Sequence, residues 1–115
     1  MEDQLKAVVV WLILNGKVEE ALEVLAEKYS VKVPAIKVGL PKKHRLKAMG
    51  CYESKKKMIS VLNSHVMKDP FVILHEFYHH LRTSREMEHK GTEKYADAFA
   101  KDFILAFKSA VENRK

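Results

Sequence analysis

The stretch DPFVILHEFYHHLR, residues 69–82, combines a helix start with histidines at helical spacing. Aspartate is a favoured N-cap residue, and proline is tolerated in the first turn because its missing N–H would have no partner there. We therefore predict that Asp69 and Pro70 begin a helix that continues to about Arg85. The rest of the fold is expected to pack around this helix.

The two sides of this predicted helix differ in character. Each residue advances about 100° around the helix axis, so His75 and His79 lie about 40° apart on one side. Apolar and aromatic residues fall on the roughly opposite side: Leu74, Phe77, Tyr78 and Leu81. We expect that side to pack on the core and the histidine side to face a site. His80 lies on the border, where a surface or partly packed histidine is expected.

The spacing His-Glu-x-x-His, with Glu76 directly after His75, is a zinc-binding signature. Two imidazoles one turn apart can bind one ion, and Glu76 lies beside them, where a carboxylate can hold a water molecule rather than the ion. The metzincin form of the motif requires a glycine and a histidine where this chain has Arg82 and Arg85. That form is excluded, so a third ligand must come from elsewhere.

The segment EKYADAFAKDF, residues 93–103, offers that third ligand. It lies near the start of a predicted final helix that continues to about Glu112. Glu93 and Asp97 are one turn apart on one face of it, and a catalytic zinc usually takes three protein ligands and leaves one position for water. Glu93 would supply the ligand oxygen. Asp97 would accept the N–H of a ligand histidine and so fix its tautomer.

The remaining sequence predicts an α+β fold with two N-terminal helices and three short strands. Residues 2–29 have helical periodicity interrupted at Asn15-Gly16, which indicates helix, tight turn, helix. The β-branched segment 31–41, broken by prolines, indicates an edge strand. The segments LKAMGCY (46–52) and KMISVLN (57–63) predict a hairpin joined by ESKK, which gives a three-stranded, mainly antiparallel sheet.

Length and composition limit the class of protein. A chain of 115 residues is expected to form one domain, residues 1–115. The single cysteine, Cys51, excludes an internal disulfide and is more typical of a packed strand residue than of a ligand. With no secretory pattern in MEDQLK, we expect a cytoplasmic protein. The apolar run AVVVWLIL (7–14) is too short for a membrane span.

The net charge of +6 raises nucleic acid as a partner. Basic residues cluster in KKHRLK (42–47) and KKK (55–57) without interleaved aromatic residues or a known DNA-reading motif. A solvated basic surface is the preferred interpretation, and a nucleic-acid partner is not expected.

His75-Glu76-x-x-His79 followed by Glu93-x-x-x-Asp97 resembles the gluzincin pattern of thermolysin-type metallopeptidases. The hairpin segment AMGCYESKKKMISVLN (48–63) resembles the strands that line their substrate cleft. In length and element order, roughly residues 30–110 resemble the minigluzincins. The resemblance implies a zincin-like fold, one zinc ion, and peptide hydrolysis in which Glu76 activates a water on the zinc.

The resemblance also implies how substrate and latency would be arranged. An extended peptide would pair with the strand at Ala48, Met49 and Gly50. Tyr95, His89 and Arg85 are available to contact substrate or stabilise the oxyanion. Minigluzincins are similar to zymogens in which the C-terminal segment, from the same or a neighbouring molecule, covers the site. The protein is therefore expected in a latent form, with residues 105–115 as the candidate latency segment. Exchange of this segment between two subunits, in a homodimer through the C-terminal helix, is one form that this coverage could take.

Several alternatives stay open from the sequence. The histidine face could be a solvated helix face, and Glu93 could simply complement the helix dipole. His89 is a rival third ligand, whereas His44 and His65 belong to no cluster of candidate ligands. For the whole chain, the alternatives are a non-catalytic zinc-binding regulatory domain and a basic nucleic-acid-binding module.

Overall fold

The computed structural model of the protein describes residues 2–41, 49–84 and 92–113. These residues form an α+β fold with four α-helices and a three-stranded sheet. In chain order the elements are α1 (Glu2–Leu14), α2 (Val18–Tyr29), β1 (Ala35–Val38), β2 (Gly50–Glu53), β3 (Met58–Val61), the 3-10 helix η2 (Val66–Lys68), α3 (Pro70–Ser84) and α4 (Thr92–Glu112). The predicted order of two helices, strands and two helices is confirmed, and β1 is an edge strand as expected.

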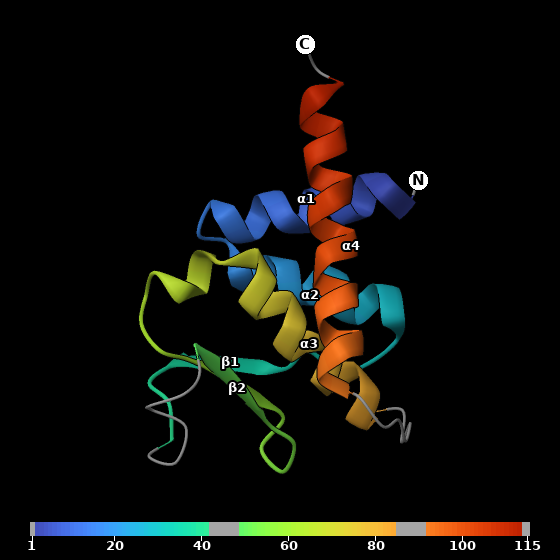
Figure 1. Cartoon of the computed structure of the whole chain (residues 1–115). Helices are drawn as coiled ribbons and strands as arrows, with labels where there is room; N and C mark the ends of the chain where they lie inside the picture. The colour runs from blue at the N-terminus through green and yellow to red at the C-terminus, as the bar shows by residue number, and fades with distance from the viewer. Residues whose placement is uncertain (1, 42–48, 85–91, 114–115) are drawn as a thin grey trace.

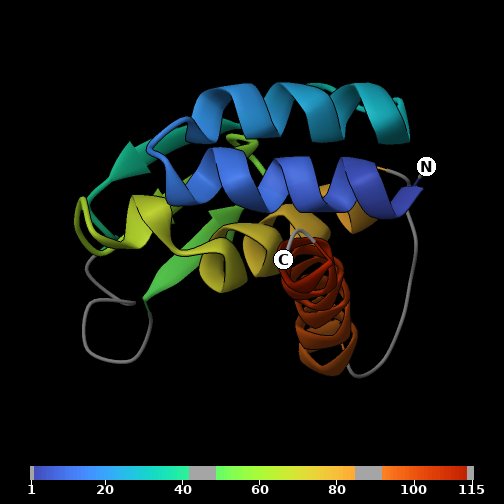
Figure 2. The same ribbon diagram turned by 90° about the horizontal axis from the view of Figure 1, so that it is seen from above.

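The helices stack on one face of the sheet. Figure 1 shows the sheet at one end of the molecule, α3 above it, α1 and α2 beyond α3, and α4 crossing both α3 and α1. From above, α1 and α2 lie side by side (Figure 2). They are joined by the predicted tight turn, in which Gly16 has a φ of 76° and the Lys17 N–H donates to the Leu12 carbonyl over 2.8 Å. A positive φ is strained for other residues, so glycine suits this position.

The sheet is mixed, so the prediction of mainly antiparallel pairing is wrong. The strand order is β1-β3-β2, with β2 antiparallel and β1 parallel to β3. A hairpin sets the relative direction only of the two strands that it joins. The connection between β1 and β2 covers residues 39–49, which is long enough to bring the chain to the far edge of the sheet. The turn signals in the sequence therefore do not predict which edge of the sheet each strand occupies or the direction of β1 relative to β3.

One hydrophobic core joins all the layers. Its largest fully buried side chains include Phe77 of α3, Phe103 of α4 and Ile59 of β3, with Ile13 and Leu22 from the N-terminal helices. In the parts of the chain that the structure describes, no helix combines the length and apolar character that crossing a membrane requires. Within this core, α3 is held on one side by the sheet and on another by α1 and α4.

Candidate metal centre

α3 begins where the sequence predicts and turns the predicted apolar side to the core. The Asp69 carboxylate accepts hydrogen bonds from the backbone N–H groups of Phe71, over 3.0 Å, and Val72, over 3.4 Å, and so caps the helix. The predicted apolar side is in the core: Leu74 and Phe77 are fully buried, Leu81 is buried and Tyr78 is half-buried. The histidine side lies next to Val72 and Glu76, which approach β2, and is directed toward α4.

His75 and His79 come together on that side. Their Nε2 atoms are 3.4 Å apart, and their side chains are 12% and 20% exposed. Burial lowers the pKa of His79, which favours the neutral imidazole. The neutral form is the one that offers a lone pair to a metal ion, so both the direction and the protonation of this ring suit a ligand.

Glu93, in the first turn of α4, reaches the same place. One carboxylate oxygen lies 2.9 Å from Nε2 of His75 and the other lies 2.8 Å from Nε2 of His79. α4 packs along α3, and the small side chains of Ala96 and Ala100, on nearly the same face of α4 as Glu93, are both fully buried. The three predicted ligands thus converge, with one donor atom from each lying within 4.8 Å of the others.

Asp97 lies one turn further along α4 and binds the outer side of the His75 ring. Its carboxylate is 2.8 Å from Nδ1 of His75. A carboxylate accepts, so Nδ1 donates a proton to Asp97. With Nδ1–H held in this way, Nε2 would offer its lone pair to an ion bound in the space shared with His79 and Glu93. This is the tautomer-fixing arrangement that commonly supports a metal-ligating histidine.

The donor set fits a tetrahedral zinc ion. Zinc binds imidazole nitrogen and carboxylate oxygen at about 2.0–2.2 Å, and donors at tetrahedral angles around it are then about 3.3–3.5 Å apart. The two imidazole nitrogens already have this separation. The carboxylate is at hydrogen-bonding distance from both rings and is 76% exposed, so it can withdraw by the few tenths of an ångström required. Three ligands also leave a fourth position open.

Glu76 is not among these donors but lies beside them. Its side chain is buried between α3 and β2, with an exposed fraction of 8%. Burial raises the pKa of Glu76 to about 7, partly opposed by the nearby imidazole of His75. A carboxyl group that titrates near neutral pH can both accept and donate a proton under physiological conditions.

β2 passes directly beside α3 because it begins with glycine. A Cβ atom at Gly50 would lie 2.7 Å from Cγ1 of Val72 and 3.5 Å from Cγ of Glu76. The first of these contacts is too short to form unless Val72 or the strand shifts. Gly50 therefore brings the strand against the helix at the level of Glu76, a packing role that the sequence reading did not assign to it.

None of the described strands pairs with the outer edge of β2. The Leu62 N–H donates to the Met49 carbonyl over 2.8 Å, so Met49 and Cys51 are directed at β3. Hydrogen-bonding direction alternates along a strand. The backbone groups of Gly50 and Tyr52 therefore point to the free edge. The backbone N–H and C=O of Met49, one of the predicted substrate-strand residues, are directed at β3, and those of Tyr52, which the sequence analysis did not single out, point outward.

His80 differs from the sequence expectation. It is fully buried rather than at the surface or partly packed. Its Nε2 atom lies 2.7 Å from the Lys32 carbonyl and its Nδ1 atom lies 2.7 Å from the Tyr52 hydroxyl. The border position on the helix wheel is covered by the sheet, which the periodicity of α3 cannot show. With both ring nitrogens bonded, His80 is not available as a ligand.

Of the remaining predicted site residues, the structure describes Tyr95, which is not brought to the cluster. Tyr95 follows Glu93 by two positions, about 200° around α4, and is directed away from the two imidazoles. His65 is exposed on the surface. The predictions for Ala48, Arg85 and His89, and that for His44, fall on residues that the structure does not describe.

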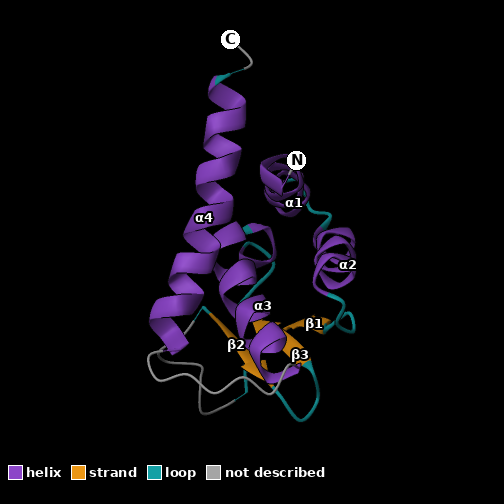
Figure 3. Ribbon diagram, turned by 90° about the vertical axis from the view of Figure 1, so that its right-hand side faces the viewer, coloured by secondary structure: helices purple, strands orange, loops and turns teal. Residues whose placement is uncertain are grey.

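Residues 105–112 continue α4 away from the site. Val111 lies about 27 Å along the helix axis from Glu93. Figure 3 shows this end of α4 extending past α1, at the opposite end of the molecule from the sheet. In this conformation the segment does not cover the site of its own chain. Coverage by a neighbouring molecule stays a prediction.

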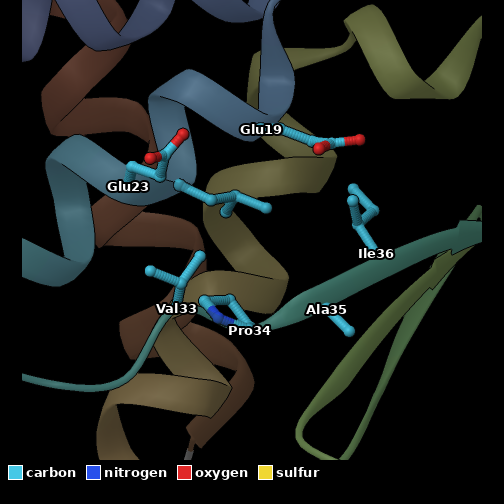
Figure 4. A pocket seen from close by; sticks show the side chains of 7 residues that line it. Glu19, Glu23, Val33, Pro34, Ala35 and Ile36 are labelled. Atoms are coloured by element: carbon cyan, nitrogen blue, oxygen red, sulfur yellow. The ribbon is translucent and has the colours of Figure 1, made fainter.

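A separate hollow lies between α2 and β1 (Figure 4). Glu19 and Glu23 of α2 face Val33, Pro34 and Ile36 across it. It shares no residue with the histidine–glutamate cluster and lies at the other edge of the sheet from β2. The α3–α4 cluster is therefore a distinct feature of the molecule.

Comparisons of the chain with protein-family models, with curated proteins and with solved structures give no match. The interpretation of the cluster therefore depends on the geometry and chemistry of its residues. The resemblance to the minigluzincins, and with it the zincin-like fold, stays a prediction.

Proposed function

We propose that the protein is a zinc-dependent metallopeptidase of the gluzincin type, built on a small zincin-like fold. His75, His79 and Glu93 would hold one zinc ion, Asp97 would orient His75, and Glu76 would transfer the proton. One observation carries the proposal: two imidazoles of α3 and a carboxylate of α4 converge within 4.8 Å, next to a buried carboxyl group that is not one of them. A purely structural metal site has no use for Glu76.

The substrate would be an extended peptide added to the free edge of β2. The backbone N–H and C=O groups of Gly50 and Tyr52 point outward there and can pair with a peptide backbone. The close approach at Gly50 sets this edge beside Glu76. A peptide bonded to β2 would thus pass in front of the proton-transfer group without a large rearrangement.

The chemistry divides between the ion and the chain. When bound, a zinc ion lowers the pKa of a water molecule and polarises a peptide carbonyl. Glu76 accepts the proton that the attacking water loses, and its protonated carboxyl group then donates that proton to the leaving amine. A pKa near neutral pH suits both halves of this transfer. His75 keeps its Nε2 lone pair available because Nδ1–H donates to Asp97.

The experiment compares zinc content and peptide cleavage in the wild type, His79→Ala and Glu76→Gln. We expect one zinc per chain in the wild type, none in His79→Ala, and full zinc without cleavage in Glu76→Gln. His65→Ala, at an exposed histidine outside the cluster, is the matched control and should behave as the wild type.

Two results would contradict the proposal in different ways. A wild-type chain without zinc would remove the metal site itself. Zinc binding with no cleavage of any peptide in a mixed library, even at low concentration and after removal of residues 108–115, would instead support a non-catalytic metal-binding domain.

We further propose that latency, if the chain is a zymogen, acts between molecules. The C-terminal part of α4 points away from the site of its own chain, so only the segment 105–115 of a second copy, in a homodimer, would cover it. Intermolecular coverage depends on protein concentration, which gives it a measurable signature.

A further inference from the structure

A hydrogen bond between Tyr52 and His80 connects α3 to β2, the strand at the edge of the sheet. His80 is the residue directly after the His75-Glu76-x-x-His79 motif. His80 of α3 is fully buried, and its ring contacts the Tyr52 ring edge-on, with centroids 5.4 Å apart. The Tyr52 hydroxyl lies 2.7 Å from its Nδ1 atom. The Lys32 carbonyl, between α2 and β1, lies 2.7 Å from its Nε2 atom. His80 thus joins three parts of the chain.

The direction of these bonds follows from the groups involved. A carbonyl only accepts, so Nε2 of His80 carries the proton and donates it to Lys32. In the neutral ring Nδ1 is then an acceptor, and the Tyr52 O–H donates to it. Every polar atom of the ring is satisfied, which is what a fully buried imidazole requires. These two hydrogen bonds therefore define a single tautomer of His80.

Tyr52 belongs to two features at once. Its side chain bonds His80, while its backbone N–H and C=O lie on the free edge of β2. The same residue would bond the substrate peptide through its main chain and α3 through its hydroxyl. The position of α3 relative to the peptide is thereby connected to the side chain of Tyr52, whose hydroxyl bonds His80 and also contacts Thr83 of the same helix.

The pair is placed to restrict rotation of α3. A ring nitrogen about 6 Å from a helix axis moves by about 1 Å when the helix rotates by about 10°. A hydrogen bond of 2.7 Å does not survive that displacement, since bonds weaken rapidly beyond about 3.2 Å. His79, the preceding residue, would move by a similar amount away from Glu93. A metal site requires its ligands within about 0.5 Å of their positions.

We propose that Tyr52 and His80 are positioning residues that hold α3 in the rotation at which His75 and His79 meet Glu93, and that set this helix against the peptide-binding edge of β2. The inference rests on the proposed function. It assigns to the residue after the zinc motif a role that the motif itself does not include. Neither residue touches the metal or the reacting atoms.

Three substitutions separate the contribution of the Tyr52–His80 hydrogen bond from that of the His80–Lys32 hydrogen bond. Tyr52→Phe removes a single oxygen atom and leaves the ring in place. His80→Gln places an amide N–H near the position of Nε2, so it retains the bond to Lys32 and loses the acceptor for Tyr52. His80→Asn places an oxygen near the position of Nδ1, so it retains the acceptor and loses the bond to Lys32.

The readouts are the zinc dissociation constant, from competition with a chromophoric chelator, and the visible spectrum of the cobalt(II)-substituted protein. We expect Tyr52→Phe and His80→Gln to weaken zinc binding about tenfold and to shift the cobalt spectrum, as outer-shell substitutions commonly do. His80→Asn should retain most of the affinity. The cobalt spectrum reports ligand geometry, which a loss of packing alone would not change.

Ile13→Val, in the core of α1, is the control for a general loss of stability. It should lower the melting temperature while leaving zinc affinity and the cobalt spectrum unchanged. If Tyr52→Phe and His80→Gln behave as this control does, the inference is overturned and the pair is only a packing element. Equal losses in His80→Asn and His80→Gln would overturn the role given to Tyr52.

The outcome also separates this inference from the proposed function. A wild-type chain that binds neither zinc nor cobalt overturns both. A wild-type chain that binds one ion, with unchanged affinity in Tyr52→Phe, overturns the positioning role alone. Because Tyr52→Phe removes only the hydroxyl, it tests the positioning role even where the His80 variants do not fold.

Discussion

The two ends of α4 present nearly the same helix face to very different surroundings. At the first end Glu93 and Asp97 bond the imidazoles that α3 presents to them. At the other end Phe107 and Val111 line a groove with Trp11 of α1, and Trp11 and Val111 are each 45% exposed. One face of one helix is thus acidic where it meets histidines and apolar where it meets α1. The partner across the contact, and not the periodicity of α4, distinguishes a candidate site from a packing surface.

Phe103 lies between the two ends, and its removal should damage both. It is 1% exposed, and its ring centroid lies 4.8 Å from that of Phe99. We expect Phe103→Ala to lower the free energy of unfolding by about 3–5 kcal/mol, because it leaves a cavity between α4 and the core. Chemical denaturation measures this. Leu105→Ala, at a side chain 64% exposed, should change stability by less than about 0.5 kcal/mol. Similar losses in both variants would mean that α4 is not anchored at Phe103.

Two aspartates on α4 provide the sharpest test of the difference between the ends. Asp97 bonds His75, whereas Asp102 pairs with Lys6 of α1. We expect Asp97→Asn to weaken zinc binding about 10- to 100-fold, because the amide no longer holds the His75 tautomer as a carboxylate does. Asp102→Asn should leave zinc affinity unchanged. Isothermal calorimetry with zinc distinguishes them, and equal affinities in the two variants would contradict the assigned role of Asp97.

The exposed end of α4 should be dispensable for the site in its own chain. From Lys108 to Asn113 every side chain is exposed. We expect deletion of residues 108–115 to change the free energy of unfolding by less than about 1 kcal/mol and to leave zinc affinity unchanged. If a second copy provides latency, cleavage per full-length molecule should fall as concentration rises, and the truncated chain should show no such fall. A concentration-independent rate in the full-length protein would contradict intermolecular coverage.

The smallest expected effect is electrostatic and lies at the α1 end. A hydrogen bond with the Asp102 carboxylate raises the pKa of Lys6 above its ordinary value of 10.5. A raised lysine pKa contributes stability that is fully present below the unfolded value and is lost as pH rises through the folded value. The free-energy difference between wild type and Asp102→Asn should therefore be present at about pH 8 and absent at about pH 12, with a size below about 1 kcal/mol. Lys101→Gln, an exposed change nearby, should show no such pH dependence. A difference between wild type and Asp102→Asn that persists at high pH would exclude the protonation of Lys6 as its cause.

The local features of the chain were predictable because they depend on neighbours within a turn or two. The Asp69 cap, the turn at Asn15-Gly16 and the alignment of His75 with His79 follow from helix geometry and side-chain chemistry alone. The pairing of Glu93 and Asp97 with the histidines was also predicted, because carboxylates one turn apart are a recognisable partner for that motif. Zinc itself, and catalysis, stay predictions.

The features that the sequence could not show are those that depend on contacts between distant elements. The direction of β1, the burial of His80 and the inward turn of Met49 are decided by how the sheet pairs and where it covers α3. Gly50 and Tyr52 acquire their roles only because β2 lies against that helix. Helix periodicity alone shows which residues share a helix face. Only the tertiary structure decided what each face meets, since packing between elements far apart in the chain leaves no local periodic signal.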